Sequence, residues 1–170
     1  MIKLRNLLTE NGLPFEKQGG KYIGYRGTFS HPSHRKSDFF GTEGVGLYIA
    51  PSIEDARFFG DVYVVTFDPP RKIITAKILP MLHSDDDDAY EAITGELKAT
   101  DGSWIIAHKI AAQHLKVNTW EKLNKAMLNG DLPRTLTRIL LKWGYDAVWT
   151  GDWIVLLDTS LCKSMTKLEV

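Results

Sequence analysis

The sequence predicts an α+β fold, with strands near both ends of the chain and a group of helices between them. Residues 21–29 and 61–68 alternate in polarity and are rich in aromatic and β-branched residues, as strands are. Residues 104–143 have the pattern of successive helices. The chain has 170 residues, of which 44% are hydrophobic, so it suits one domain with its own core.

The first half of the chain is expected to hold a short helix and four strands. Residues 3–11 carry three leucines on one helical face, and an Asn-Gly pair ends that helix. The first strand covers residues 21–29 and is followed by a polar loop rich in turn residues. The other strands are expected at residues 46–50, 61–68 and 71–78, with a Pro-Pro pair between the last two.

A short helix is predicted to begin after Ser52. Ser52 suits the N-cap, and Asp55 follows three residues later, as in a capping box. Phe58 and Phe59 are expected to face inward from this helix.

A helical insertion is predicted at about residues 84–143, within a single domain of residues 1–170. Four aspartates, Asp85–Asp88, open it; like charges repel, so a solvated loop or a helix start is a better interpretation than a metal site. Pro133 fits the first turn of the last helix, and Gly144 fits its end. The three helices are expected at residues 104–117, 119–129 and 133–143. Two strands close the domain, at residues 146–150 and 152–158, joined by a tight turn.

Composition limits the function classes. Lys+Arg and Asp+Glu are 21 each, and a net charge of zero argues against a general nucleic-acid binder. Cys162 is the single cysteine, so a disulfide framework is excluded and a free thiol is expected. His108 and His114 lack the spacing of a helical zinc pair and are expected to be core or surface residues. Without a signal peptide or an apolar run long enough to span a bilayer, the expected location is the cytoplasm.

Two short stretches suggest a binding site. In Tyr25-Arg26-Gly27-Thr28, the guanidinium of Arg26 can fork onto a phosphate or ribose, and Gly27 allows a flat ligand to approach the backbone. A structural ion pair is the alternative for Arg26. Tyr48 could stack on a ring, with Phe58 as a second wall; the alternatives are a core tyrosine and ordinary helix packing.

Together, YRGT and the segment GVGLYIAPSIEDARFFG (residues 44–60) resemble the ADP-ribosyltransferase superfamily. The second segment is similar to the Gly-x-Gly-x-Tyr-Phe-Ala motif of the poly(ADP-ribose) polymerase and diphtheria-toxin branch, although the spacing to Ala56 is one residue short. Arg26 stands where that branch has histidine. Arginine is typical of the arginine-serine-glutamate toxins, whose Ser-Thr-Ser segment is missing here. The chain is thus most similar to small ADP-ribosyltransferase domains of phage and bacterial conflict proteins.

The third motif of the family departs from its pattern. GYDAVWTGDWIVLLD has the cadence of the family's last segment, and Asp158 matches its terminal aspartate, but the glutamate is missing. Direct counting puts Trp153 in the place of the glutamate, with Asp152 one residue before. Asp152 is the favoured functional acid. Asp146 is the other acid nearby and is expected to tie down the turn after the helix. The resemblance covers residues 22–68 and 143–161.

The resemblance implies a split β-sheet that holds NAD in a cleft, with no metal. Arg26 would hold the adenosine-side ribose or a phosphate, and Asp152 would bond the nicotinamide-side ribose. The nicotinamide would contact Gly27, Thr28, Tyr48 and Phe58. Ser52 could touch NAD, although a helix cap explains it as well.

The expected function is mono-ADP-ribosylation of a macromolecule with release of nicotinamide. Neutral charge favours a protein target over a nucleic acid, and family habit implies a toxin or effector of a phage or bacterium. The main alternative, motivated by the missing glutamate, is a catalytically inactive relative that binds a partner or a nucleotide. NAD-dependent RNA 2′-phosphotransferase chemistry would need more basic residues near the phosphate site than this chain has.

Overall fold

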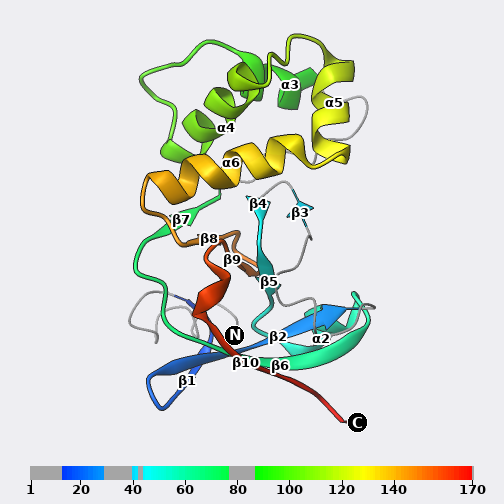
Figure 1. The fold of residues 1–170 in the computed structure, drawn as a ribbon, viewed down its shortest axis with the longest axis vertical. Helices are drawn as coiled ribbons and strands as arrows, with labels where there is room; N and C mark the ends of the chain where they lie inside the picture. The colour runs from blue at the N-terminus through cyan, green and yellow to red at the C-terminus, as the bar shows by residue number, and fades with distance from the viewer. Residues whose placement is uncertain (1–12, 29–39, 42–43, 77–86, 170) are drawn as a thin grey trace.

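The computed structural model describes residues 13–28, 40–41, 44–76 and 87–169. In this part of the chain, strands and helices build three layers: a group of helices, a small sheet beneath them, and a second sheet beneath that (Figure 1). The predicted α+β class is confirmed. Among the described residues, the structure has no helix that is long and apolar enough to cross a membrane.

The sheet farthest from the helices is antiparallel and has the order β1-β2-β6-β10. Its long central strands are those that the sequence predicts as alternating. Tyr22, Val65 and Phe67 point to its buried face. The strands are β1 (Glu16–Gln18), β2 (Lys21–Thr28), β6 (Asp61–Phe67) and β10 (Cys162–Lys167).

The middle sheet has the order β5-β9-β8-β7, in which only the β7–β8 pair is parallel. Its strands are short and buried on both faces, which explains why they are apolar runs and not alternating ones. They are β5 (Leu47–Ile49), β7 (Ile73–Thr75), β8 (Ala147–Trp149) and β9 (Ile154–Leu156). A two-stranded ladder of β3 (Phe40–Gly41) and β4 (Gly44–Val45) precedes β5.

The helices are α2 (Ile53–Arg57), α3 (Asp87–Thr94), α4 (Ser103–His114), α5 (Trp120–Leu128) and α6 (Asp131–Lys142). The three long helices that the sequence predicts are therefore confirmed, with ends that differ by a few residues. Pro133 lies in the first turn of α6. Gly144 takes a positive φ of 89° just after the helix, and the Tyr145 N–H bonds the Leu140 carbonyl, as in a Schellman motif.

Two apolar cores separate the layers. One lies between the sheets and includes Phe15, Tyr22 and Phe67, whose rings meet edge-on or tilted. The other lies between the middle sheet and α3–α6, and it joins strand residues such as Val148 and Val155 to helix residues such as Leu136. The helical segment thus shares a core with the middle sheet.

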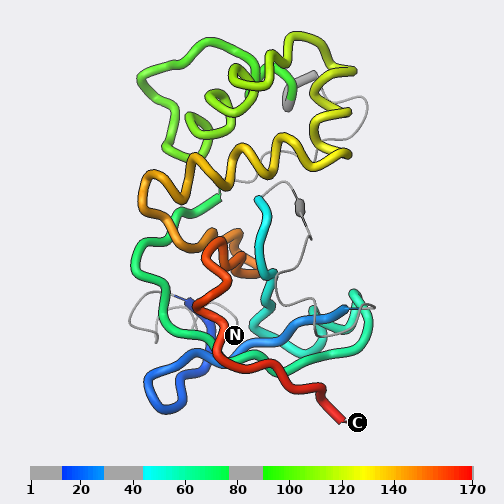
Figure 2. The backbone as a smooth tube through the Cα atoms, in the orientation of Figure 1, coloured from blue at the N-terminus to red at the C-terminus, as the bar shows by residue number. Residues whose placement is uncertain are grey.

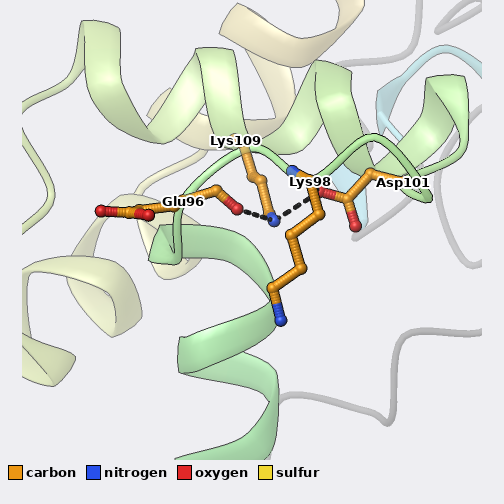
Figure 3. A network of polar contacts seen from close by, with 4 residues as sticks. All are labelled: Glu96, Lys98, Asp101 and Lys109. Carbon is orange, nitrogen blue, oxygen red and sulfur yellow. Dashed lines mark hydrogen bonds and ion pairs between the residues drawn. The ribbon is translucent and has the colours of Figure 1, made fainter.

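A buried lysine fastens the segment before α4. Lys109 is 4% exposed, and its ammonium donates to the Asp101 carboxylate at 2.7 Å and to the Glu96 carbonyl at 2.7 Å (Figure 3). The Asp101 carboxylate also accepts the Lys98 N–H at 2.9 Å. These bonds hold the pKa of Asp101 below its usual value, mainly through the Lys109 hydrogen bond and then through the Lys98 N–H. The network closes the loop between α3 and α4.

The path of the chain explains what the sequence did not predict (Figure 2). From β1 in the far sheet, the described chain passes through the middle sheet to the helices and returns along β10 to pair with β6. Strand β10, which starts at the free thiol Cys162, was not among the predicted strands. Neither was β1, which forms a hairpin with β2 through two glycines of positive φ, Gly19 and Gly20.

One orientation predicted from the sequence is wrong. Phe58 and Phe59 do not face inward, because Phe58 is 83% exposed and Phe59 51% exposed. Helix α2 has only five residues, and Ala56 is the side chain that it buries. The predicted helix over residues 3–11, the polar loop after β2 and the first two aspartates of the acidic run lie outside the described residues. Helix α3 begins at Asp87, so the run does lead into a helix.

Candidate functional site

The first two motifs meet where the sheets cross. Tyr25 of β2 and Ala50, just after β5, exchange two backbone hydrogen bonds of 2.8 and 2.7 Å. This isolated bridge is the point at which the far sheet touches the edge strand of the middle sheet. It brings the YRGT segment alongside the LYIA segment, although more than twenty residues separate them in sequence.

Arg26 is buried at this junction. It is 8% exposed, and its Nη1 donates to the Tyr48 carbonyl at 3.3 Å. Within the described part of the chain, no carboxylate forms an ion pair with it. Burial lowers the pKa of Arg26, with a smaller opposing contribution from Cys162.

A guanidinium in this environment needs an explanation. It carries several N–H donors, and the described residues give it one hydrogen bond, from Nη1 to the Tyr48 carbonyl. A buried charge without a counter-ion is costly, and natural proteins keep one mainly where it is used. The structural ion pair considered for Arg26 is not found among the described residues.

Both the ring and the hydroxyl of Tyr48 have contacts that fix the side chain. Its ring is partly buried against the core under the helices, and its hydroxyl donates to the Gly44 carbonyl at 2.7 Å. Its neighbours Leu47 and Ile49 belong to the other core, between the sheets. Side chains alternate along a strand. Therefore Arg26, which shares a face of β2 with Tyr22, approaches β5 from the side opposite the Tyr48 ring. The structure brings Arg26 to the backbone of Tyr48 but not to its ring.

Gly27 is a glycine because α2 packs against it. A Cβ built there would lie 1.7 Å from the Ala56 carbonyl oxygen and 3.0 Å from the Cβ of Phe59. Gly27 was predicted to let a flat ligand approach the backbone, whereas the group that lies at its Cα is the Ala56 carbonyl of α2. Thr28 ends β2 and is partly exposed.

Ser52 caps α2 as predicted. Its Oγ accepts the Asp55 N–H at 3.2 Å and donates to the Asp55 carboxylate at 2.9 Å. Phe58, the C-cap residue, projects into solvent a few residues away. An exposed aromatic ring is available to a ligand, whereas packing within the helix does not account for it.

Asp152 lies at the tip of the β8–β9 turn. Gly151 has a φ of 99°, and the Thr150 hydroxyl accepts the N–H groups of Asp152 and Trp153 at 3.2 and 3.1 Å. The β5–β9 ladder ends at the pair Ile49–Ile154, so this turn lies beyond the end of the ladder. The Asp152 side chain is exposed and has no hydrogen bond to a described residue.

The other two candidates near this turn have structural roles. Trp153 occupies the position where direct counting along the motif places the family's glutamate. It packs on the core under the helices. The Asp146 carboxylate accepts the N–H groups of Arg71 and Lys72 at 2.8 and 3.1 Å. Asp146 was expected to tie down a turn, and it does, but the tied segment is the connection between β6 and β7.

A cavity of about 450 Å³ opens between the β6–β7 connection, the end of α6 and the start of β10. Asp68, Asp146 and Asp158 line it together with Arg71 and Lys163. No residue of the first two motifs reaches it. Lys163 pairs with Asp68 at 3.3 Å, and Asp158 accepts the Ser160 N–H and hydroxyl.

No sequence pattern pointed to Thr137, which is buried in α6 and whose hydroxyl accepts the N–H of Val45 at 2.8 Å. Ninety-two residues separate the two partners, and no local pattern can reveal a contact of that range.

Comparison of the chain with protein-family models, with curated proteins and with solved structures found no match.

Proposed function

We propose that the chain is an NAD-dependent ADP-ribosyltransferase that modifies a macromolecule, for which a protein is the favoured class. The observation that carries the proposal is Arg26, which is 8% exposed and lacks a carboxylate partner among the described residues, at the junction with the Tyr48 segment. A pyrophosphate or a ribose offers the acceptors that such a guanidinium lacks. Two sheets crossing at this junction are compatible with the split-sheet fold that the resemblance implies.

In the proposed reaction, the bond between the ribose C1′ and the nicotinamide nitrogen breaks, and the electron pair leaves with nicotinamide. A nucleophilic atom of the acceptor bonds to C1′ and loses its proton. Positive charge develops on the ribose as the bond breaks, much as in glycoside hydrolysis. The site therefore needs positioning, ring stacking and one carboxylate.

The residues divide these tasks in the proposal. Arg26 holds the phosphate or adenosine ribose. Tyr48 supports the nicotinamide from β5, with the exposed ring of Phe58 closing over it. Asp152 bonds the ribose and orients the acceptor. It lies at the tip of a turn in which its N–H donates to the Thr150 hydroxyl. Ser52 is a structural cap that lies beside this region.

A second candidate function is a catalytically inactive domain that binds a nucleotide or a partner protein. It is favoured by Asp152, whose exposed carboxylate has no contact with Arg26 or Tyr48 within the described residues. It predicts NAD binding without nicotinamide release.

The test is incubation of the purified protein with NAD labelled on the adenylate phosphate and with a bacterial lysate. The wild type should label a discrete band, and both Asp152→Ala and Arg26→Ala should lose at least 90% of the label, roughly a tenfold loss such as the removal of about 1.4 kcal/mol of binding produces. Asp146→Ala is unsuitable as a control, because that carboxylate holds two backbone N–H groups. Glu91→Gln, on the exposed face of α3, serves instead.

Label that persists in Asp152→Ala would support the transferase activity and would show that another residue supplies the carboxylate. Bound NAD without label or free nicotinamide would favour the inactive domain. Absence of both NAD binding and label would overturn the proposal.

A further inference from the structure

Helix α6 contacts the first residues of the second motif. The short strand β4 precedes the Tyr48 segment and packs on α6, which passes directly above it (Figure 1). One side chain makes the connection: Thr137, in the middle of α6 and 8% exposed. Its hydroxyl donates to the Pro133 carbonyl at 2.8 Å and accepts the Val45 N–H at 2.8 Å. Donor and acceptor are both used, so the rotamer of Thr137 is fixed.

Gly44 fits against the same hydroxyl. Its φ is 117°, a conformation that favours glycine, and a Cβ there would lie 2.8 Å from the Thr137 Oγ1. The Gly44 carbonyl, in turn, accepts the hydroxyl of Tyr48 at 2.7 Å. Thr137 and Tyr48 therefore hold the same dipeptide, Gly44–Val45, from two sides.

We propose that Thr137 is a positioning residue for Tyr48, and that α6 is the rigid support of the ligand-binding edge of β5. The Thr137 hydroxyl, fixed on a rigid helix, holds the Val45 N–H and so positions the Gly44 carbonyl of the same peptide. This carbonyl accepts the Tyr48 hydroxyl and so positions the tyrosine ring. The functional part of this inference rests on the proposed function, in which Tyr48 contacts NAD. The positional part stands on the hydrogen bonds alone.

This inference assigns a role to the helical segment. The segment is joined to the middle sheet by a shared core and to the second motif by Thr137. Movement of α6, for example when a target binds to the helices, would be transmitted to Tyr48 through Gly44–Val45.

The experiment separates the two parts. The protein is labelled with 3-fluorotyrosine, and the ¹⁹F signal of Tyr48 is assigned by its loss in Tyr48→Phe. Thr137→Val, which removes the hydroxyl but keeps the shape, should shift or broaden that signal, and Thr137→Ser should restore it. Thr135→Val is the matched control, because Thr135 is equally exposed at 8% on the same helix and makes no side-chain hydrogen bond to a described residue.

If Thr137→Val does not fold, Thr137→Cys replaces it, since a thiol has a similar volume and forms weaker hydrogen bonds. The positioning role is overturned if the Tyr48 signal in the Thr137 variant matches that in Thr135→Val.

The second readout is NAD affinity, measured by calorimetry. Thr137→Val should weaken it about tenfold, Thr137→Ser should remain within about twofold of the wild type, and Thr135→Val should leave it unchanged. Such losses are typical when the support of a binding residue is removed. If the wild type binds no NAD, the proposed function fails while the fluorine signal still decides whether Thr137 positions Tyr48. Equal affinity in Thr137→Val and the wild type would overturn the functional part.

Discussion

At the residue scale, Arg26 combines a charged side chain with burial and with no carboxylate partner among the described residues. It is almost fully buried, and within the described residues one carbonyl at 3.3 Å is its hydrogen-bond partner. An arginine followed by glycine on a strand was identified from sequence because of its chemistry. What the sequence could not give was its burial, since this depends on β5 and β6, which lie beside β2 only after folding.

Other residues of the candidate site have sufficient structural reasons for their identity. Gly27 leaves room for the carbonyl of Ala56, and Ser52 caps α2. The predicted cap at Ser52 is confirmed, because a cap depends on neighbours in the chain, whereas the contact between Gly27 and α2 forms only on folding. Whether they also contact a ligand is a separate question.

Ser52 allows the two roles to be separated. Ser52→Ala should lower the free energy of unfolding by about 1 kcal/mol, the usual value of an N-cap hydrogen bond, without changing NAD affinity. Ser52→Asp keeps a capping oxygen and should retain most of the stability. Urea unfolding and calorimetry measure the two quantities. A tenfold loss of NAD affinity in Ser52→Ala with unchanged unfolding would show that the serine serves the ligand instead.

At the element scale, the sequence predicted what periodicity and end signals encode. The long strands β2 and β6, the Ser52 N-cap of α2 and the glycine after α6 were all found. It missed β10, whose residues become a strand through pairing with β6. It also assigned the wrong direction to Phe58, because a helix as short as α2 has too few turns for periodicity to fix its buried face.

The loop between α3 and α4 depends on an ion pair, so its stability should depend on pH. The pKa of Asp101 is lower in the folded protein than in the unfolded chain, where it is about 3.9. The unfolded state therefore binds more protons in the acid range. The contribution of the pair is fully present well above the unfolded pKa, and it is lost as pH falls through the lower, folded value.

Urea unfolding of the wild type and of Asp101→Asn between pH 7 and pH 3 measures this effect. The variant should be less stable at pH 7, because Lys109 remains buried without its carboxylate, and the two curves should converge toward pH 3. Glu91→Gln, an exposed change on α3, is the control and should follow the wild type. A constant difference between the wild type and Asp101→Asn at every pH would contradict the account.

At the scale of the whole molecule, helices, middle sheet and far sheet form one stack with two cores. The predicted order of strands, helices and strands gave the class but not the stacking, which depends on contacts between the two ends of the chain. The candidate site is found where the sheets cross, and Thr137 connects the third layer to it. Sequence motifs identified the two segments that meet there; the helix that supports them could be recognised only in the folded chain.

In the proposed function, the junction of the two sheets binds NAD through Arg26. Calorimetric titration of NAD into the wild type and into Arg26→Gln measures this binding. The wild type should bind, and the variant should bind at least tenfold more weakly, a loss of about 1.4 kcal/mol or more. Arg26→Gln should unfold no more easily than the wild type, because a buried charge without a counter-ion contributes little to stability. A wild type that does not bind NAD, or a variant that binds it equally well, would contradict the claim.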